Sequence, residues 1–568
     1  MKSLAGPLFL ALAAAVAAAQ QDTRVFDVST LTAPRPGLHA PLLGPETSLD
    51  QYFSLEEGPE PWPFLDSDNL IELIRSQVDP ESWDRGGEIL AADGGLLVVR
   101  SWPNVLGRIE SLLRDLEAEA SRRTRVSFEV FEVDREKYGE VAAIRDAAAF
   151  DFASLGGRKL ESASVDAWPG VRIALKVTNR VRYVADYDVE VAQGSMIADP
   201  IVRFLEEGLA AEFTAHPLLD GERVLLEAVL QSGHAVLPIR EVKLAVDEEY
   251  LPEAFRSPGR FVFGTIALPQ FRHAEAFVTR LIDSGGRFVV PLLSADRLVV
   301  FVIEARVAGG AAGRLLDAGA LCRAPIAREF GFPRELEPSE KVLLAPRPRV
   351  APPVGPPFEG GLLAEMVYAA TGAGSALVLS GGTMILGGSE EARDRAKEYL
   401  RAREKEVFRP VTVEVRIDSA PGGAAEDAGR PLFAGKVSAI SGRTACLMGG
   451  DTLNYLADHD VEVAQESRIA RPNVGQSFAG LVANVTPRLG AGGSARISVE
   501  VLLARRAPMS SFDTGSQCLG TVDVVSEKRT ILHTTVEAPL GEPCRLDAGP
   551  DPFDAARRLT LVLTATAE

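Results

Sequence analysis

The segment that decides the fold is present twice in this chain: residues 183–200 read YVADYDVEVAQGSMIADP, and residues 455–472 read YLADHDVEVAQESRIARP. Thirteen of the eighteen positions are identical at a constant shift of 455 − 183 = 272 residues, whereas unrelated segments of this length would match at about one position. Self-similarity at a fixed distance indicates an internal duplication. The pattern therefore predicts one structural unit that is used twice.

The similarity extends beyond this segment in both directions, with small insertions. Glycines and prolines downstream of it recur in the second copy, and each precedes a strand-like run. Upstream, two strand-like stretches match as well. The aligned positions are Gly208 with Gly480, Pro217 with Pro487, and residues 126–133 (VSFEVFEV) with residues 411–417 (VTVEVRI).

Each copy divides into a smaller and a larger part. The smaller part opens with an amphipathic segment, residues 69–77 or 362–370, whose apolar residues have helical spacing. Short strands follow, and then a second helix is predicted over residues 104–116, with apolar residues three and four apart. The larger part shows strand patterns punctuated by Gly or Pro. The predicted fold class is α+β: two tandem copies of a small α+β module, each followed by a β-rich domain.

The length of 568 residues alone favours about three to five domains, and the repeat reduces these to one two-part unit used twice. Seven prolines between residues 338 and 361 indicate an extended, semi-rigid linker between the copies. The predicted parts are a signal peptide (1–19), an extended Pro-rich arm (20–65), a small α+β module (66–122), a β-rich domain (123–308), a Pro-rich linker (309–358), a second small module (359–407) and a second β-rich domain (408–568).

The first twenty residues, MKSLAGPLFLALAAAVAAAQ, combine one Lys, an apolar run and an Ala-x-Ala site. This order is typical of a cleaved secretory signal peptide, so we expect the mature protein to work outside the cytoplasm. No later stretch reaches eighteen uninterrupted apolar residues, so we expect no transmembrane helix. With 60 Lys+Arg against 79 Asp+Glu, the net charge of −19 argues against a nucleic-acid partner and against binding to an anionic membrane surface through basic residues.

Carboxylates occupy alternate positions of the repeated segment, so on a strand they would share one face. One interpretation is a cation site, because hard cations prefer clustered oxygen ligands. The other is the solvated face of an amphipathic strand, which we favour because an extended strand spaces such groups about 7 Å apart in a row. The position of Tyr187 is taken by His459 in the second copy, which favours a structural role for this His. The carboxylates are Asp186, Asp188 and Glu190 in the first copy and Asp458, Asp460 and Glu462 in the second.

The repeat indicates which positions of the first copy correspond to two of the four cysteines. At a shift of 256 residues, Cys518 and Cys544 correspond to Val262 and Phe288. If these positions lie on adjoining strands, the second copy could replace an apolar contact by a disulfide, and export favours oxidation. We therefore predict a Cys518–Cys544 disulfide.

No motif of a catalytic, metal or cofactor site is found in the sequence. The chain lacks C-x-x-C, H-E-x-x-H, G-x-S-x-G and the Walker-type phosphate loop. The residues that the two copies share are mainly apolar, Gly, Pro and the strand-face carboxylates. We therefore predict neither an enzyme nor a cofactor-binding protein, and an exported hydrolase or metal enzyme is the least favoured hypothesis.

Several stretches of the first copy resemble secretins. A small α+β module that ends in a helix, followed by V-x-x-E-V at residues 126–130, is similar to the junction between the periplasmic N-domains and the C-terminal domain of that family. Gly208, a strand, Pro217 and then Asp220-Gly221 resemble the pattern G-x-x-L-x-V-x-P-x-x-x-D-G. Further matches are residues 279–286 (TRLIDSGG) and the closing strand 298–307 in the first copy, and Gly480, Pro487 and residues 559–565 in the second.

Secretins are multimeric outer-membrane channels of type II and type III secretion systems and of type IV pilus machines. The resemblance implies β-rich secretin-like domains and a homo-oligomer that is periplasmic or associated with the outer membrane. Other secretion or pilus components of the envelope would be its further partners. The I-P-x-x-G-x-L-F gate motif of the family is missing from both copies. A soluble periplasmic binding or scaffold protein with the same fold and no pore is therefore the alternative.

Overall fold

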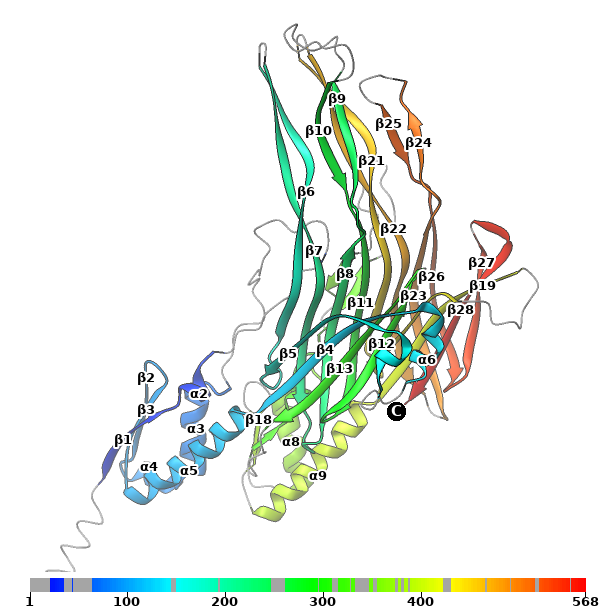
Figure 1. Ribbon diagram of the computed structural model, residues 1–568. Helices are drawn as coiled ribbons and strands as arrows, with labels where there is room; N and C mark the ends of the chain where they lie inside the picture. The colour runs from blue at the N-terminus through cyan, green and yellow to red at the C-terminus, as the bar shows by residue number, and fades with distance from the viewer. Residues whose placement is uncertain are drawn as a thin grey trace, which may run out of the picture.

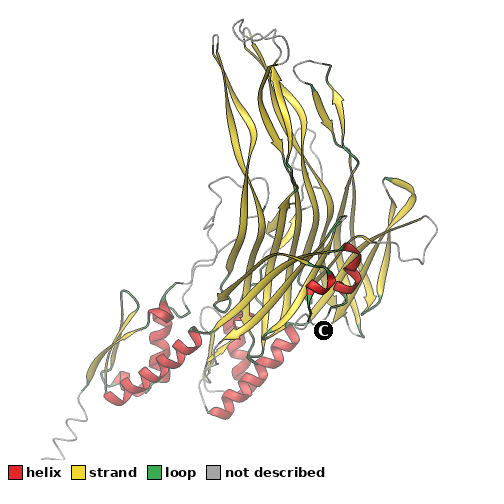
Figure 2. Ribbon diagram, in the orientation of Figure 1, coloured by secondary structure: helices red, strands yellow, loops and turns green. Residues whose placement is uncertain are grey.

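Two large antiparallel sheets, packed face to face, dominate the computed structural model of the chain (Figure 1). Small helical units lie at one end of the sheets, and long hairpins of one sheet extend beyond the other sheet at the opposite end (Figure 2). The structure describes residues 21–567 except 35–42, 44–63, 145–149, 193–194, 247–260, 295, 309–314, 327, 332–346, 351–354, 373–375, 379–382, 387–388, 422–430, 465–466, 491, 516–519 and 552.

The first sheet has the strand order β26-β23-β22-β21-β11-β8-β7-β6. Every neighbouring pair in it is antiparallel. Its strands are β6 (Ile173–Ala192), β7 (Ser195–Pro217), β8 (Arg223–Ala235), β11 (Gln270–Asp283), β21 (Ala445–Ala464), β22 (Ser467–Leu489), β23 (Ser494–Arg506) and β26 (Glu527–Pro539).

The second sheet has the strand order β27-β28-β19-β20-β12-β13-β4-β5 and is also antiparallel throughout. Its strands are β4 (Arg123–Val133), β5 (Arg158–Ala167), β12 (Gly286–Leu293), β13 (Leu298–Ala308), β19 (Pro410–Pro421), β20 (Pro431–Ile440), β27 (Pro543–Asp551) and β28 (Asp554–Ala567).

One continuous apolar core fills the space between the two sheets and runs through both halves of the chain. It forms because apolar residues alternate along the strands and so share one face. In the first half, Phe128 of β4 and Phe213 of β7 meet across the sheets with ring centroids 5.3 Å apart. Burying each such ring contributes about 1.5–3 kcal/mol, so the sheets are held together largely by this layer.

The two halves have the same strand order. In the first sheet, β11-β8-β7-β6 of the first half corresponds to β26-β23-β22-β21 of the second half. The ladders correspond in detail, since a bulge follows Val184 in the β6–β7 pair and another follows Leu456 in the β21–β22 pair. These bulges lie one repeat shift of 456 − 184 = 272 residues apart.

Parts of the predicted arm and linker form short regular elements. Part of the arm forms β1 (Asp22–Asp27), which pairs with β3, and part of the linker forms β14 (Leu315–Asp317), which pairs with β18. A short helix follows each strand, α2 (Ser29–Thr32) and α7 (Gly319–Cys322). Segments of three to six residues carry too little periodicity to be predicted, and these strands form because a neighbouring hairpin offers its edge.

The helical unit before each large β region contains two longer helices and a small hairpin. In the first unit these are α3 (Ser67–Gln77), α4 (Pro80–Asp84), β2 (Glu88–Ala92), β3 (Leu96–Ser101) and α5 (Pro103–Ala120). In the second they are α8 (Gly360–Thr371), β17 (Ala376–Val378), β18 (Thr383–Leu386) and α9 (Glu390–Val407). Among the described residues, no helix is long and apolar enough to cross a membrane.

The remaining elements lie in connections and at hairpin tips. They are the 3-10 helices Arg135–Lys137 and Phe152–Leu155, α6 (Tyr138–Ala142), β9 (Arg240–Val246), β10 (Phe261–Leu268), β15 (Arg328–Gly331), β16 (Arg347–Val350), β24 (Ser510–Asp513) and β25 (Thr521–Val524).

The second helical unit packs against the β strands of the first half. Leu363 of α8 and Leu400 of α9 share an apolar cluster with Leu218 and Leu225, at the turn between β7 and β8. Glu404 of α9 is buried and accepts a hydrogen bond from the backbone N–H of Leu219 at 3.2 Å. The second helical unit therefore contacts the β strands of the first half before the strands of the second half begin.

Candidate assembly interface

The two halves have the same strand order and join head to tail. The strand at one end of the first half pairs with the strand at the opposite end of the second half. In the first sheet, the last strand of the first half, β11, pairs with the first strand of the second half, β21, over eight residue pairs from Gln270–Leu453 to Phe277–Cys446. In the second sheet, β12 pairs with β20 through Leu292–Gly435 and Leu293–Ala434. We call these two ladders the internal junction.

Apolar side chains seal the internal junction on both faces of the first sheet. Ala276 lies opposite Leu447, and both belong to the core between the sheets. On the other face, Phe277 and Cys446 form a buried cluster with Phe330 of β15, which comes from the linker. The backbone of Phe330 is held by Asn484 of β22, through an N–H donated to Oδ1 at 2.9 Å and a carbonyl that accepts from Nδ2 at 3.0 Å. The linker therefore covers the seam between the halves.

A buried ion pair also joins the halves at this seam. Arg443, which precedes β21, donates from Nη1 to Oε1 of Glu227 on β8 at 2.5 Å. The other oxygen of Glu227 accepts from the backbone N–H of Ile326 in the linker at 2.9 Å. Burial raises the pKa of Glu227, while the charge of Arg443 opposes that rise. Burial likewise lowers the pKa of Arg443, against the attraction of Glu227.

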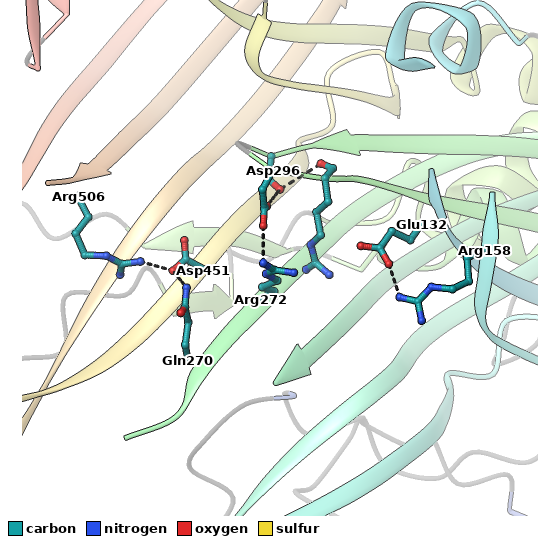
Figure 3. Close-up of polar contacts among 9 residues, drawn as sticks. Glu132, Arg158, Gln270, Arg272, Asp296, Asp451 and Arg506 are labelled. Carbon is teal, nitrogen blue, oxygen red and sulfur yellow. Dashed lines mark hydrogen bonds and ion pairs between the residues drawn. The ribbon is translucent and has the colours of Figure 1, made fainter. Parts of the chain in front are cut away.

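Polar side chains continue across the junction in the first sheet (Figure 3). Gln270 of β11 donates to Oδ2 of Asp451 on β21 at 2.9 Å, and Arg506 of β23 donates to the same oxygen. His273 lies 2.6 Å from the hydroxyl of Thr452. Burial, with a smaller contribution from the charge of Arg297, lowers the pKa of His273 to about 3. This imidazole therefore stays neutral at physiological pH and acts as a hydrogen-bonding group.

The same polar row extends through the first half toward its outer edge (Figure 3). Arg272 of β11 pairs with Asp296, in the turn between β12 and β13, at 2.7 Å. Farther along, Arg158 of β5 pairs with Glu132 of β4. The Arg272–Asp296 pair links the first sheet to a turn of the second, whereas Arg158 and Glu132 both belong to the second sheet. They bind side chain to side chain, and among the described residues no group of three or more His, Cys, Asp or Glu could hold a metal ion.

The outermost strands of the double sheet have one neighbour each among the described strands. In the first sheet β6 pairs with β7 and β26 pairs with β23, and in the second sheet β5 pairs with β4 and β27 with β28. We call these four strands the outer edges. The strands β6 and β26 are 20 and 13 residues long, and they expose apolar side chains, with Val177 at 40% and Ile531 at 50%. Long edge strands with exposed apolar side chains are templates for pairing with another chain.

The predicted carboxylate stripe lies at the bulges of β6 and β21. Asp186 accepts from the backbone N–H of Tyr187 at 2.8 Å, and Asp458 accepts from that of His459 at 2.8 Å. Asp188 and Asp458 are exposed. The first carboxylate of each stripe therefore satisfies an amide of its own bulge, a local role that the alternation of charges did not reveal. The side chains of Glu190, Asp460 and Glu462 lie outside the described part of the structure.

The predicted motif glycines lie where the backbones of two strands approach closely. Gly208 has φ +131°, and a Cβ there would lie 2.2 Å from the carbonyl oxygen of Val177 on β6. A Cβ at Gly480 would lie 2.4 Å from the carbonyl oxygen of Gly449 on β21. Only glycine fits either position. Pro217 is the last residue of β7, whereas Pro487 lies in β22 opposite Ile497.

The predicted Cys518–Cys544 disulfide stays a prediction, because one of its two cysteines lies outside the described residues. Cys544 has a free thiol in β27, and Cys518 lies outside the described residues.

Comparisons with known proteins give no match to a protein-family model. A search of the curated proteins gives no match either. Among solved structures, the chain is similar to the secretin InvG of the Salmonella SPI-1 type III secretion injectisome, with 11% identity and a TM-score of 0.22 over 51% of this chain and 88% of that chain. It is also similar to the type II secretion system secretin GspD of E. coli K12, with 8% identity and a TM-score of 0.19 over 97% and 90% of the chains.

A third similar structure is the type IV competence pilus secretin PilQ of V. cholerae, with 8% identity and a TM-score of 0.15 over 99% of this chain and 82% of that chain. These are secretins, the family that the sequence motifs resemble. At these identities and TM-scores, the likeness by itself establishes neither the fold nor the function of this chain.

Proposed function

We propose that this exported protein assembles edge to edge with further copies of itself into a closed, double-layered β ring. The ring would serve protein secretion in the cell envelope, as a channel or as a channel-associated scaffold. The observation that carries this proposal is the head-to-tail internal junction, because the outer edges repeat its two sides. Strand β6 corresponds to β21, and β26 corresponds to β11, so each outer edge matches a strand that is already paired within the chain.

A head-to-tail contact differs from a two-fold contact in what it leaves behind. A two-fold contact uses up the same surface on both partners, whereas a head-to-tail contact leaves one partner surface at each end. Repeating it gives a ring when the rotation between units closes, and an open filament otherwise. The head-to-tail direction is the same in both sheets. In the second sheet the first half ends at the outer strand β5, and the second half ends at the outer strand β27.

Strand β26 also favours assembly on energetic grounds. Natural proteins usually protect long edges with charged residues, bulges or covering segments, because bare edges cause aggregation. The sequence of β26, EKRTILHTTVEAP, instead contains a run of residues with high strand propensity between charged ends. Pairing with a specific partner strand would remove this tendency to aggregate.

The role in secretion rests on the sequence. A signal peptide would export the chain, and the secretin-like motifs occur in both halves. The groups at the internal junction bind one another and form no convergent acid, base or nucleophile constellation, so the proposed role is architectural. The alternative, a soluble periplasmic scaffold with the same fold, shares the assembly but not the membrane.

The full-length protein, expressed in a host with an outer membrane, tests this proposal. Membranes and soluble extract are separated, and each fraction is purified with and without detergent. Mass photometry and negative-stain microscopy are expected to show one large, closed species from the membrane fraction. Rings in the soluble fraction alone would support the scaffold and reject the channel. A strict monomer in both fractions would overturn the proposal.

A further inference from the structure

We infer that neighbouring chains join through β26 of one chain and β6 of the next, in the register that β11 and β21 use within a chain, so that each chain supplies two consecutive units of the ring. This inference rests on the proposed ring and adds to it a partner strand, a register and a ratio of units to chains. The occupant of each outer edge is a second copy of this protein, because the same pairing already exists inside the chain.

The register follows from the ladders on either side. The bulges after Val184 and Leu456 place β6 and β21 at a shift of 272 residues. Gly233 on β8 and Ala504 on β23 are equivalent, because they pair with the aligned glycines Gly208 and Gly480. His273 of β11 pairs with Gly233 and Arg529 of β26 pairs with Ala504, so the shift between β11 and β26 is 529 − 273 = 256. The internal pair Ala276–Leu447 then becomes 276 + 256 = 532 opposite 447 − 272 = 175. Leu532 therefore faces Leu175 of the neighbouring chain.

This register brings together apolar residues at the two open ends of the core. Leu175 and Leu532 are both partly buried and pack against the shared core between the sheets. One residue beyond the end of the internal ladder, the same register sets Thr534 opposite Ile173, which also packs against that core. A slip by one residue would turn Leu532 toward the charged face of β6, since side chains alternate between the faces of a strand. Pairing in the inferred register makes the core continuous from chain to chain.

Charges on the opposite face are complementary in the same register. Glu527 falls opposite Arg180 of the neighbouring chain. Within its own chain, Glu527 is paired with Arg529, while Arg180 donates to buried Glu206 of β7 at 3.2 Å. The junction would therefore order these groups as Arg529, Glu527, Arg180, Glu206, with the sign of the charge changing at each step. Opposite charges directly across strands stabilise a sheet, and like charges destabilise it.

Disulfide trapping between two differently tagged chains tests the register. The background carries Cys322→Ser, Cys518→Ser and Cys544→Ser and keeps the buried Cys446. One chain carries Leu532→Cys, and the coexpressed partner carries Leu175→Cys. Directly opposed residues have Cβ atoms about 4.5–5.5 Å apart, within reach of a disulfide after small adjustments. Mild oxidation is expected to give a covalent dimer that carries both tags and is absent when either chain is oxidised alone.

A matched control shifts the partner cysteine to Val177→Cys, on the same face but two residues away, which is about 7 Å along the strand. We expect at least a tenfold lower yield from this pair. A second pair, Thr534→Cys with Ile173→Cys, repeats the test should the first pair impair assembly. Rings that form but link through Val177, or through neither pair, would overturn the inference and leave the ring intact. Absence of rings from the parent protein would instead overturn the proposed function, and this inference with it.

Discussion

The internal junction and the outer edges are built on corresponding strands, yet their surroundings differ. At the internal junction, the linker covers the seam, and the buried pair of Glu227 and Arg443 connects the halves. At the outer edges, Val177 and Ile531 are exposed instead. The internal contact therefore forms with the fold, whereas the outer contact needs a second chain. One pairing geometry thus serves both stability and assembly, and variants at the two places should affect different measurements.

A charge on the outer edge should have the largest effect. In the inferred register Ile531 faces Lys176 of the neighbouring chain, so Ile531→Lys places two ammonium groups opposite each other. We expect loss of all higher assemblies in mass photometry, with an unchanged melting temperature because Ile531 is 50% exposed. Leu90→Lys, at an exposed position of β2 away from the edges, is the matched control and should assemble normally. Normal rings from Ile531→Lys would show that β26 is not the contact.

A change inside the internal junction should lower stability rather than assembly alone. Arg443→Met removes the partner of buried Glu227, and leaving a buried charge uncompensated costs about 3–5 kcal/mol. We expect a loss of about 3 kcal/mol, toward the low end of this range, because two hydrogen bonds to Glu227 remain, from Ile326 and Thr214. Urea denaturation of the unassembled variant Ile531→Lys, with and without Arg443→Met, measures it. Adding Glu227→Gln should recover most of the loss, and no loss at all would contradict the role assigned to the pair.

A charge reversal should sharpen the register. Arg180→Glu would place two carboxylates across the outer junction, and Glu527→Arg would place two guanidinium groups there. Each single variant should weaken assembly by about tenfold, or about 1.4 kcal/mol per junction. Combining both changes in one chain should restore part of the assembly, since the pair across the junction is then reversed while the new like-charge contacts with Arg529 and Glu206 remain. Additive weakening, measured from the concentration dependence of ring formation, would argue against this pairing.

The smallest effect concerns pH at the outer edge of the second sheet. Burial, and then the charge of Glu207, raise the pKa of Glu161 on β5 to about 7. The folded state therefore keeps a proton that the unfolded chain loses near pH 4.5, and its stability falls as the pH rises from about 4.5 to about 7. Glu161→Gln should remove this loss, on the order of 1 kcal/mol at pH 8 after allowing for partial hydration. Melting curves at pH 5 and pH 8 measure it, with Asp188→Asn as the control. An equal effect at both pH values would contradict the assignment.

Much of the β structure could be predicted from the sequence, because the repeat and the strand alternation are local signals. The positions of Gly208 and Gly480 were also found in this way, although their structural reason, a backbone approach to β6 and β21, needs the fold. The short strands β1 and β14 were missed because three to six residues show no reliable periodicity. The bulges of β6 and β21 were missed because one extra residue leaves the carboxylate pattern unchanged.

The internal junction could not be predicted from a single sequence. Its polar contacts join residues that are far apart in the chain, such as Gln270 and Asp451, 181 residues apart. Neither residue belongs to a motif, and no local pattern indicates which strand edges meet. The duplication predicts two similar units. Only the strand order of the sheets shows that the units join head to tail and that their unpaired outer edges correspond to the two strands of the internal junction.

The most direct test of this account compares the number of chains in a ring with the number of units seen in it. Native mass spectrometry of the detergent-purified ring gives the number of chains, and top-view averages from electron microscopy give the number of radial units. We predict two units for every chain, with the spacing across chain boundaries equal to the spacing within a chain. One unit per chain, or a particle without rotational order, would contradict the claim that the internal junction is repeated between chains.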